Sequence, residues 1–117
     1  MATRAYLVTL ILQELGVWQT GQDLPPEDFR VADQRLPFLL RAMGKAKIYT
    51  VDDPDVYIPD EAVTELARYL AGELAQTFGL ADTELATVTQ NAGLAELALR
   101  AQRTTGPTYA PQRAQYL

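Results

Sequence analysis

PDEAVTELARYLAGELAQTFG, residues 59–79, is the stretch that decides the fold. Its apolar side chains recur at helical spacing over several turns, at Val63, Leu66, Ala67, Leu70, Leu74 and Phe78, a pattern that predicts a long amphipathic helix. Asp60 and Glu61 suit the positive N-terminal end of that helix, and Gly79 is a typical stop signal. A chain built around such a helix is expected to be mainly α, with other helices packed against this one.

Three further helices are predicted, over about residues 3–15, 26–43 and 83–103. Each one starts at a recognisable signal, namely Thr3 or Asp82 as a capping side chain and Pro26 as a first helical residue. Pro37 lies inside the second helix. Because proline removes a backbone hydrogen bond there, we expect it to kink or split that helix. The sequence thus predicts a small helical bundle of about four helices.

The apolar faces of these helices are expected to meet in one core. The first helix is expected to contribute Leu7, Val8, Ile11, Leu12 and Leu15, and the second Val31, Leu36, Leu39, Leu40 and Met43. For the fourth helix the expected inner face is Leu85, Val88, Ala92, Ala95 and Leu99, with Leu94 and Leu97 widening it.

A segment at about residues 46–58 interrupts the helical pattern. Its β-branched and aromatic residues, on either side of an Asp-Pro turn, predict a short extended or hairpin insertion. A lone two-stranded ribbon is only marginally stable in water, so the insertion must pack on its own helices or on a neighbouring chain. The predicted inter-subunit contacts are Ile48, Tyr49, Val56, Tyr57 and Ile58.

The composition excludes several classes of function. With no cysteine and no histidine among 117 residues, the chain cannot form disulfides, thiolate nucleophiles or His-dependent triads. The net charge of −5 argues against a protein that grips nucleic-acid phosphates. An acidic cluster between Asp52 and Glu61 lacks the central glycine of a calcium-binding loop, and the apolar run near the N-terminus is too short to span a membrane. We therefore expect no catalytic residue, metal, cofactor or membrane partner.

The C-terminal segment TTGPTYAPQRAQYL, residues 104–117, differs from the rest of the chain. All 15 acidic residues lie at or before Glu96, so this end is basic while the body is acidic. Two prolines and a glycine prevent a helix there, yet aromatic residues are retained, a composition typical of docking peptides. The chain is thus divided into a helical domain, 1–103, and an extended docking tail, 104–117.

The overall layout resembles a known family. The likeness is carried by LILQELGVWQTGQDLPPEDFRVADQRLPFLLRAMG (10–44), AVTELARYLAGELAQTFGL (62–80) and RTTGPTYAPQR (103–113). In the order of their helices, insertion and tail, these stretches resemble the head-to-tail adaptor proteins of tailed bacteriophages. Among those adaptors, the tail-accessory, packaged-DNA-stabilising proteins of short-tailed phages are the most similar in pattern.

This resemblance implies a structural virion protein, assembled in the host cytoplasm, that forms a twelve-fold ring beneath the portal protein. Such a ring extends the DNA channel, lets DNA pass without specific binding, and carries a downstream tail or nozzle protein. It also implies that the tail docks on portal subunits through Thr105, Pro107, Tyr109, Pro111, Arg113, Tyr116 and Leu117. The alternative is a non-viral helical interaction module, or an antitoxin-like one, whose tail folds on binding.

Overall fold

The computed structural model describes residues 3–51 and 58–104. These residues form four helices, α1 (Arg4–Glu14), α2 (Pro26–Lys45), α3 (Asp60–Leu74) and α4 (Asp82–Thr104). No strand occurs within the described ranges, so the prediction of a mainly helical bundle is confirmed. Residues 46–51 form a turn and a loop after α2. Residues 52–57, which include the predicted Asp-Pro turn as well as Val56 and Tyr57, lie outside the described ranges.

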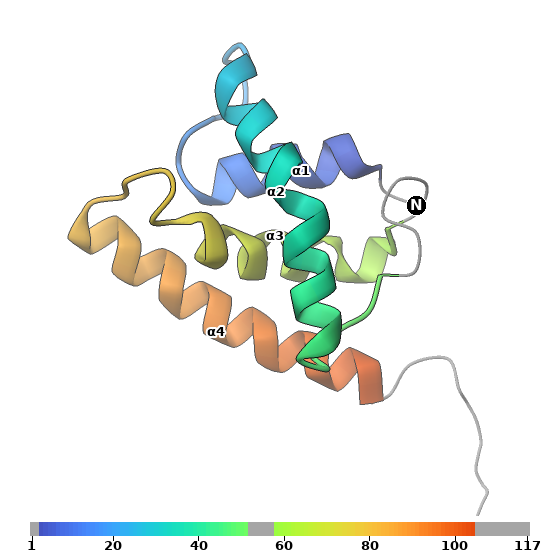
Figure 1. Cartoon of the computed structure of the whole chain (residues 1–117). Helices are drawn as coiled ribbons and strands as arrows, with labels where there is room; N and C mark the ends of the chain where they lie inside the picture. The colour runs from blue at the N-terminus through green and yellow to red at the C-terminus, as the bar shows by residue number, and fades with distance from the viewer. Residues whose placement is uncertain (1–2, 52–57, 105–117) are drawn as a thin grey trace, which may run out of the picture.

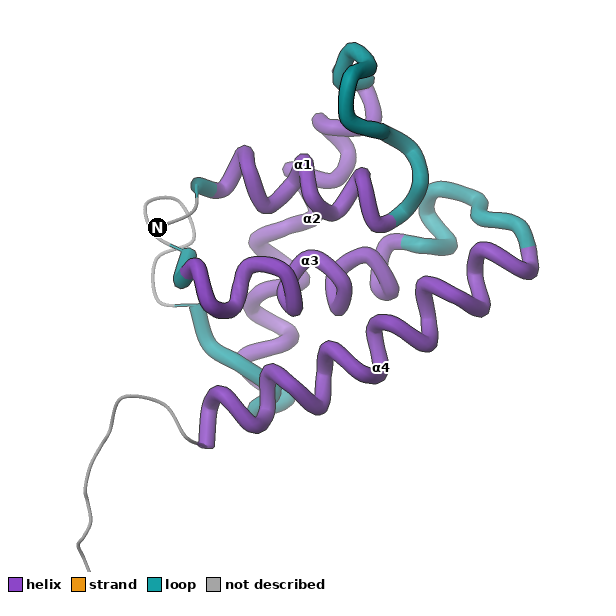
Figure 2. Tube along the Cα trace, turned by 180° about the vertical axis from the view of Figure 1, so that it is seen from behind, coloured by secondary structure: helices purple, strands orange, loops and turns teal. Residues whose placement is uncertain are grey.

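The helix α3 lies at the centre of the arrangement. Figure 1 shows α1 on one side of α3 and α4 on the other, with α2 crossing in front of them. The view from behind in Figure 2 shows the same order, with α1, α3 and α4 in one layer and α2 beyond it. Because α3 contacts all three other helices, the stretch of sequence with the strongest helical pattern is also the centre of the core.

Local signals fix the helix ends largely as expected. The Thr3 hydroxyl accepts a hydrogen bond from the Tyr6 backbone N–H at 3.1 Å and caps α1. The helix α2 begins at Pro26 and runs on through Pro37 to Lys45, so Pro37 does not split it. The predicted end of α3 is wrong: the helix stops at Leu74 and residues 75–79 form turns. Gly79 closes that segment with a φ of +65°, a conformation that favours glycine.

The core is apolar throughout. Within the described part of the chain, no polar or charged side chain is buried. The largest fully buried side chains come from all four helices and the insertion: Leu7, Val8, Ile11, Leu12, Leu36, Met43, Ile58, Leu66, Leu70, Leu74 and Leu99. The helices α3 and α4 approach closely where Gly72 faces Ala92, since a Cβ at Gly72 would lie 2.4 Å from the Ala92 Cβ. A small residue is therefore required there.

Two of the expected inner faces were assigned too broadly. In α4, Leu94 and Leu97 do not widen the core but are 61% and 66% exposed. In α2, Val31 and Leu39 are only half-buried, and Ala32 is buried in the core instead. The expected faces of α1 and α3 are confirmed, apart from Phe78, which is half-buried after the end of α3. Each of the two outer helices thus keeps apolar residues on its surface.

No helix among residues 3–51 and 58–104 is both long enough and apolar enough to cross a membrane.

Candidate interaction surfaces

The outward side of α2 carries an open apolar groove. Its volume is about 500 Å³. The aromatic ring of Phe38 stands in it with 66% of its surface exposed. The groove is lined by Val31, Gln34, Arg35, Phe38 and Leu39. Aromatic and aliphatic side chains next to arginine are the composition found at the centre of protein–protein interfaces, so this groove is a candidate docking surface.

A second hollow adjoins the C-terminal half of α2. It has a volume of about 480 Å³ and is lined by Pro37, Leu40, Arg41, Gly44, Lys45, Thr50 and Val51. Arg41 belongs to this hollow and also reaches the first one, since its guanidinium carbon lies 5.8 Å from the centre of the Phe38 ring. A cation at that distance is attracted by the face of the ring. We call the two hollows, together with the Arg41–Phe38 pair, the α2 face.

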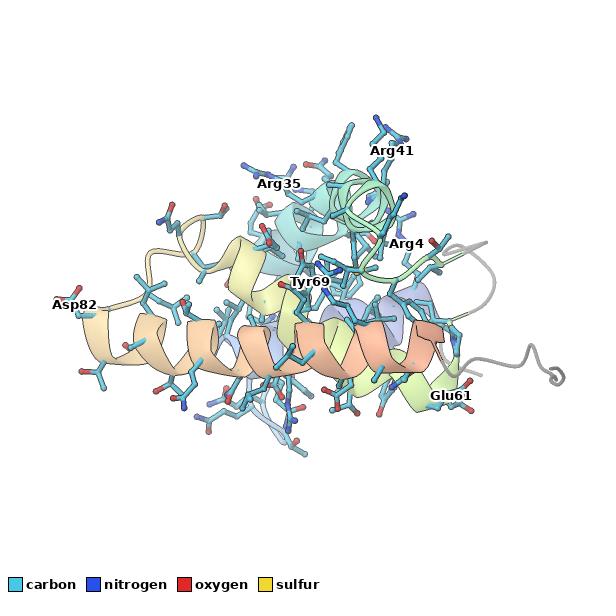
Figure 3. The ribbon with its side chains drawn as sticks, turned by 90° about the horizontal axis from the view of Figure 1, so that it is seen from below. Arg4, Arg35, Arg41, Glu61, Tyr69 and Asp82 are labelled. Carbon is cyan, nitrogen blue, oxygen red and sulfur yellow. The ribbon has the colours of Figure 1, made fainter. Side chains whose placement is uncertain are left out.

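The α2 face is cationic. Residues 34–51 contain Arg35, Arg41, Lys45 and Lys47 and no acidic residue, and all four of these cations are exposed. Figure 3 shows Arg35 and Arg41 projecting from α2 away from α4. The helices α3 and α4 have the opposite charge, because residues 60–104 hold seven acidic residues and three arginines, a net charge of −4. The molecule therefore has a basic edge and an acidic half.

The outward side of α4 is uncharged. Between residues 86 and 101 its exposed side chains are Ala86, Thr87, Thr89, Gln90, Leu94, Leu97 and Ala101, with Gly93 among them. The two charged residues of this stretch, Glu96 and Arg100, are half-buried and form an ion pair at 3.0 Å. Exposed helix faces of globular proteins are usually polar and charged. We call this uncharged surface, with Leu94 and Leu97 at its centre, the α4 face.

Several polar groups of the described residues form contacts that support the fold. The guanidinium of Arg4 on α1 donates to the Asp33 carboxylate of α2 at 2.8 Å and to the Asp33 backbone carbonyl at 2.9 Å. Burial, together with Glu73, raises the pKa of Tyr69 to about 12, so its hydroxyl stays protonated at neutral pH. Within the described ranges, no group of three acidic, His or Cys side chains is placed to hold a metal ion.

The residues predicted to contact a neighbouring subunit lie in different surroundings. Ile48 and Ile58 are buried in the chain's own core, whereas Tyr49 is half-buried. Val56 and Tyr57 lie outside the described residues. The insertion thus packs on its own helices at both of its ends, as one of the two expectations had it. Contact between the insertion and a second subunit stays a prediction. Among the described residues that were predicted to make this contact, Tyr49 is partly exposed.

The predicted docking tail lies outside the described residues. This holds for every residue assigned to it, that is Thr105, Pro107, Tyr109, Pro111, Arg113, Tyr116 and Leu117. Its binding to a portal protein therefore stays a prediction of the sequence alone.

A scan against known protein families, a search of curated proteins and a search of solved structures each found no match.

The α2 and α4 faces were not predicted from the sequence, although two signals for them are present. One is the absence of any acid from residues 34–51 in an otherwise acidic chain. The other is Phe38, which falls between the expected inner positions Leu36 and Leu39 and so has no place on one narrow stripe. A helix with more apolar residues than one stripe can hold presents some of them to solvent or to a partner.

Proposed function

We propose that this chain is a structural head-to-tail adaptor of a tailed bacteriophage. Its copies form a ring, in the resemblance twelve-fold, beneath the portal protein. The ring extends the DNA channel and joins the capsid vertex to the next tail or nozzle protein. The C-terminal segment, residues 105–117, docks on portal subunits, and the work of the protein is assembly rather than catalysis.

The observation that carries this proposal is the presence of large exposed apolar side chains on two different faces of one small helical subunit. Phe38 on α2 and Leu94 and Leu97 on α4 are the large exposed apolar side chains of these faces. Contiguous exposed apolar surface typically marks a site of protein–protein contact. A subunit that has two such faces on different helices is suited to assemblies with more than two members.

The charge distribution supports a role around DNA that does not involve gripping it. The acidic residues of α3 and α4 repel phosphates, and a channel wall of like charge keeps DNA from binding as it passes. The basic α2 face is suited to contacts with other protein surfaces. We assign the acidic residues of α3 to the channel side of the ring and the basic α2 face to subunit contacts.

The proposal is tested by purifying the full chain with and without the portal protein encoded in the same genome. Native mass spectrometry and negative-stain imaging then report whether a complex with several copies per portal ring forms. We expect such a complex with the full chain and its loss on deletion of residues 105–117. Because that deletion leaves all four helices intact, circular dichroism of the shortened chain serves as the folding control.

A chain that stays monomeric and does not bind the portal overturns the adaptor function. In that case, capture of one non-viral partner through the tail points to the alternative interaction module.

A further inference from the structure

We propose that the α2 face of one copy binds the α4 face of a second copy, so that copies of this chain join head to tail. The inference rests on the proposed assembling function for its biological meaning. It adds to that function the two surfaces through which neighbouring subunits meet, neither of which includes the tail.

The two faces differ in shape. The α2 face is hollowed, with a groove of about 500 Å³ beside Phe38. The helix α4 runs straight (Figure 2), and its outer side carries the exposed Leu94 and Leu97, flanked by Gly93 and by the small side chains of Ala86 and Ala101. Laying an apolar helix face into an apolar groove is a common mode of recognition between proteins. Small flanking residues allow the backbones to come close.

Charge decides between the possible pairings of these faces. If two α2 faces met, Arg35 and Arg41 of one copy would be placed against the same cations of the other. If two α4 faces met, two halves that each carry a net charge of −4 over residues 60–104 would be brought together. Only the pairing of α2 with α4 brings the basic edge of one copy against the acidic half of the next. Like charges in an interface are unfavourable and opposite charges steer association.

The α4 face itself contains no charge, which helps this pairing. Its centre can be covered without leaving an unpaired ion buried, because Glu96 and Arg100 already bind each other within the same helix. The exposed carboxylates of Asp82 and Glu84 lie in the first turn of α4, just before the α4 face begins, and Figure 3 shows Asp82 at that end of the helix. There they remain in contact with water while attracting the cations of α2. The contact thus has an apolar centre and a charged rim.

The contact uses a different surface on each partner and therefore leaves one face of each copy free. A further copy can bind at either end of the pair. Such heterologous contacts continue into a closed ring or an open filament, depending on the rotation between neighbours.

The absence of cysteine from the chain allows a direct test by site-specific cross-linking. Gln34→Cys places a thiol in the α2 groove and Gln90→Cys places one on the α4 face, and both glutamines are exposed. The two full-length variants are mixed and treated with a short bis-maleimide. We expect a covalent dimer in the mixture and little product from either variant alone. A chain that carries both substitutions should give a ladder of dimers, trimers and larger species.

Two controls separate this contact from random collision. Adding Phe38→Asp to the Gln34→Cys variant should lower the yield of the mixed dimer about tenfold or more, since a central aromatic anchor is removed. Gln19→Cys, exposed in the loop between α1 and α2, should give no product when it is mixed with Gln90→Cys. Raising the salt concentration should reduce the mixed product, because the charged rim is screened.

Cross-linking of Gln90→Cys to itself would indicate a symmetric α4·α4 contact and overturns the inference. So does a mixed product that Phe38→Asp leaves unchanged, or the lack of any product in concentrated mixtures. The outcome is independent of the portal experiment. Copies that cross-link as expected but do not bind a portal remove the adaptor function and leave this contact standing. If portal-bound rings form but the mixed cross-linked product does not, the contact between the α2 and α4 faces is overturned and the adaptor function stands.

Discussion

The helices α3 and α4 both carry large apolar side chains, but they differ in how many of these side chains are buried. All of the large apolar side chains of α3 that were expected to face inward are buried, and none is left on the surface. In α4, Leu99 is fully buried while Leu97, two residues before it, is 66% exposed. The difference follows from position, because α3 has neighbours on several sides and α4 packs mainly on α3. A helix at the edge of the bundle is covered on one side only, however many apolar residues its sequence contains.

The largest change in stability is expected when a buried side chain is removed from α4. Leu99→Ala should lower the free energy of unfolding by about 2–5 kcal/mol, as is typical for a large-to-small change that leaves a cavity. Urea unfolding followed by circular dichroism measures the change. A loss below about 1 kcal/mol would show that the inner side of α4 contributes little to the core, contrary to the burial of Leu99.

The close approach of α3 and α4 gives the next largest effect. Gly72→Ala adds a Cβ that would lie 2.4 Å from the Ala92 Cβ, so the helices must move apart. We expect a net loss of about 1–3 kcal/mol, the usual range for overpacking, in spite of the better helix propensity of alanine. Combining Gly72→Ala with Ala92→Gly should restore much of the lost stability, since the second change removes the opposing methyl group.

The matched change on the other side of α4 should have the opposite sign. Gly93→Ala meets no atom within 4 Å of the new Cβ, and glycine inside a helix costs about 0.8–1.0 kcal/mol relative to alanine. The variant should therefore be more stable by somewhat less than about 1 kcal/mol. Measurement in dilute solution keeps any contact between copies out of the result. If Gly72→Ala and Gly93→Ala shifted the urea midpoint alike, the assigned orientation of α4 would be wrong.

These contrasts also mark how far the sequence predicts the fold. The number of helices and most of their ends could be predicted because they depend on local signals, such as the Thr3 hydroxyl that caps α1 and the proline that begins α2. The end of α3 was placed too late because Phe78 continues the apolar spacing beyond Leu74. After Leu74 the chain turns, and Phe78 still packs against the core from that turn. Spacing alone cannot distinguish a longer helix from a turn that returns to the core.

The candidate surfaces were less predictable for a related reason. Apolar periodicity shows that a helix has a hydrophobic side, but its width does not tell which part meets the core. That choice depends on where the neighbouring helices lie, and so Leu94, Leu97, Val31 and Leu39 were placed inward. The basic run of residues 34–51 was visible in the sequence. The sequence does not show which way these cations point. The structure places Arg35 and Arg41 on the side of α2 that faces away from α4 (Figure 3).

The tyrosine between α3 and α4 gives a smaller effect that depends on pH. Tyr69 has a pKa of about 12, raised by burial and by the charge and hydrogen bond of Glu73, whereas an unfolded chain gives tyrosine a pKa of about 10. The neutral hydroxyl is therefore favoured by folding. The stability that it contributes is complete below about pH 10 and is lost as the pH rises toward 12. Between those values, Tyr69→Phe should flatten the fall in the free energy of unfolding.

This prediction can be checked with the chain's own absorbance. The protein has six tyrosines, and alkaline titration near 295 nm should show one of them ionising later than the others. The late step should be absent from Tyr69→Phe. A titration curve that the substitution scales down without changing its shape would mean that Tyr69 ionises with the rest.

The smallest effect on stability is expected at the outer side of α4, and it completes the comparison with Leu99. Leu97→Ala removes the same atoms from the same helix, but from a side chain that is 66% exposed, so the cost should stay within about 0.5 kcal/mol. The matched pair keeps chemistry and helix propensity constant, and only the side of α4 differs. A cost close to that of Leu99→Ala in dilute solution would show that Leu97 is covered within a single chain. A negligible cost in dilute solution that grows with protein concentration would show that another copy covers it, because binding to the folded state alone stabilises that state by mass action.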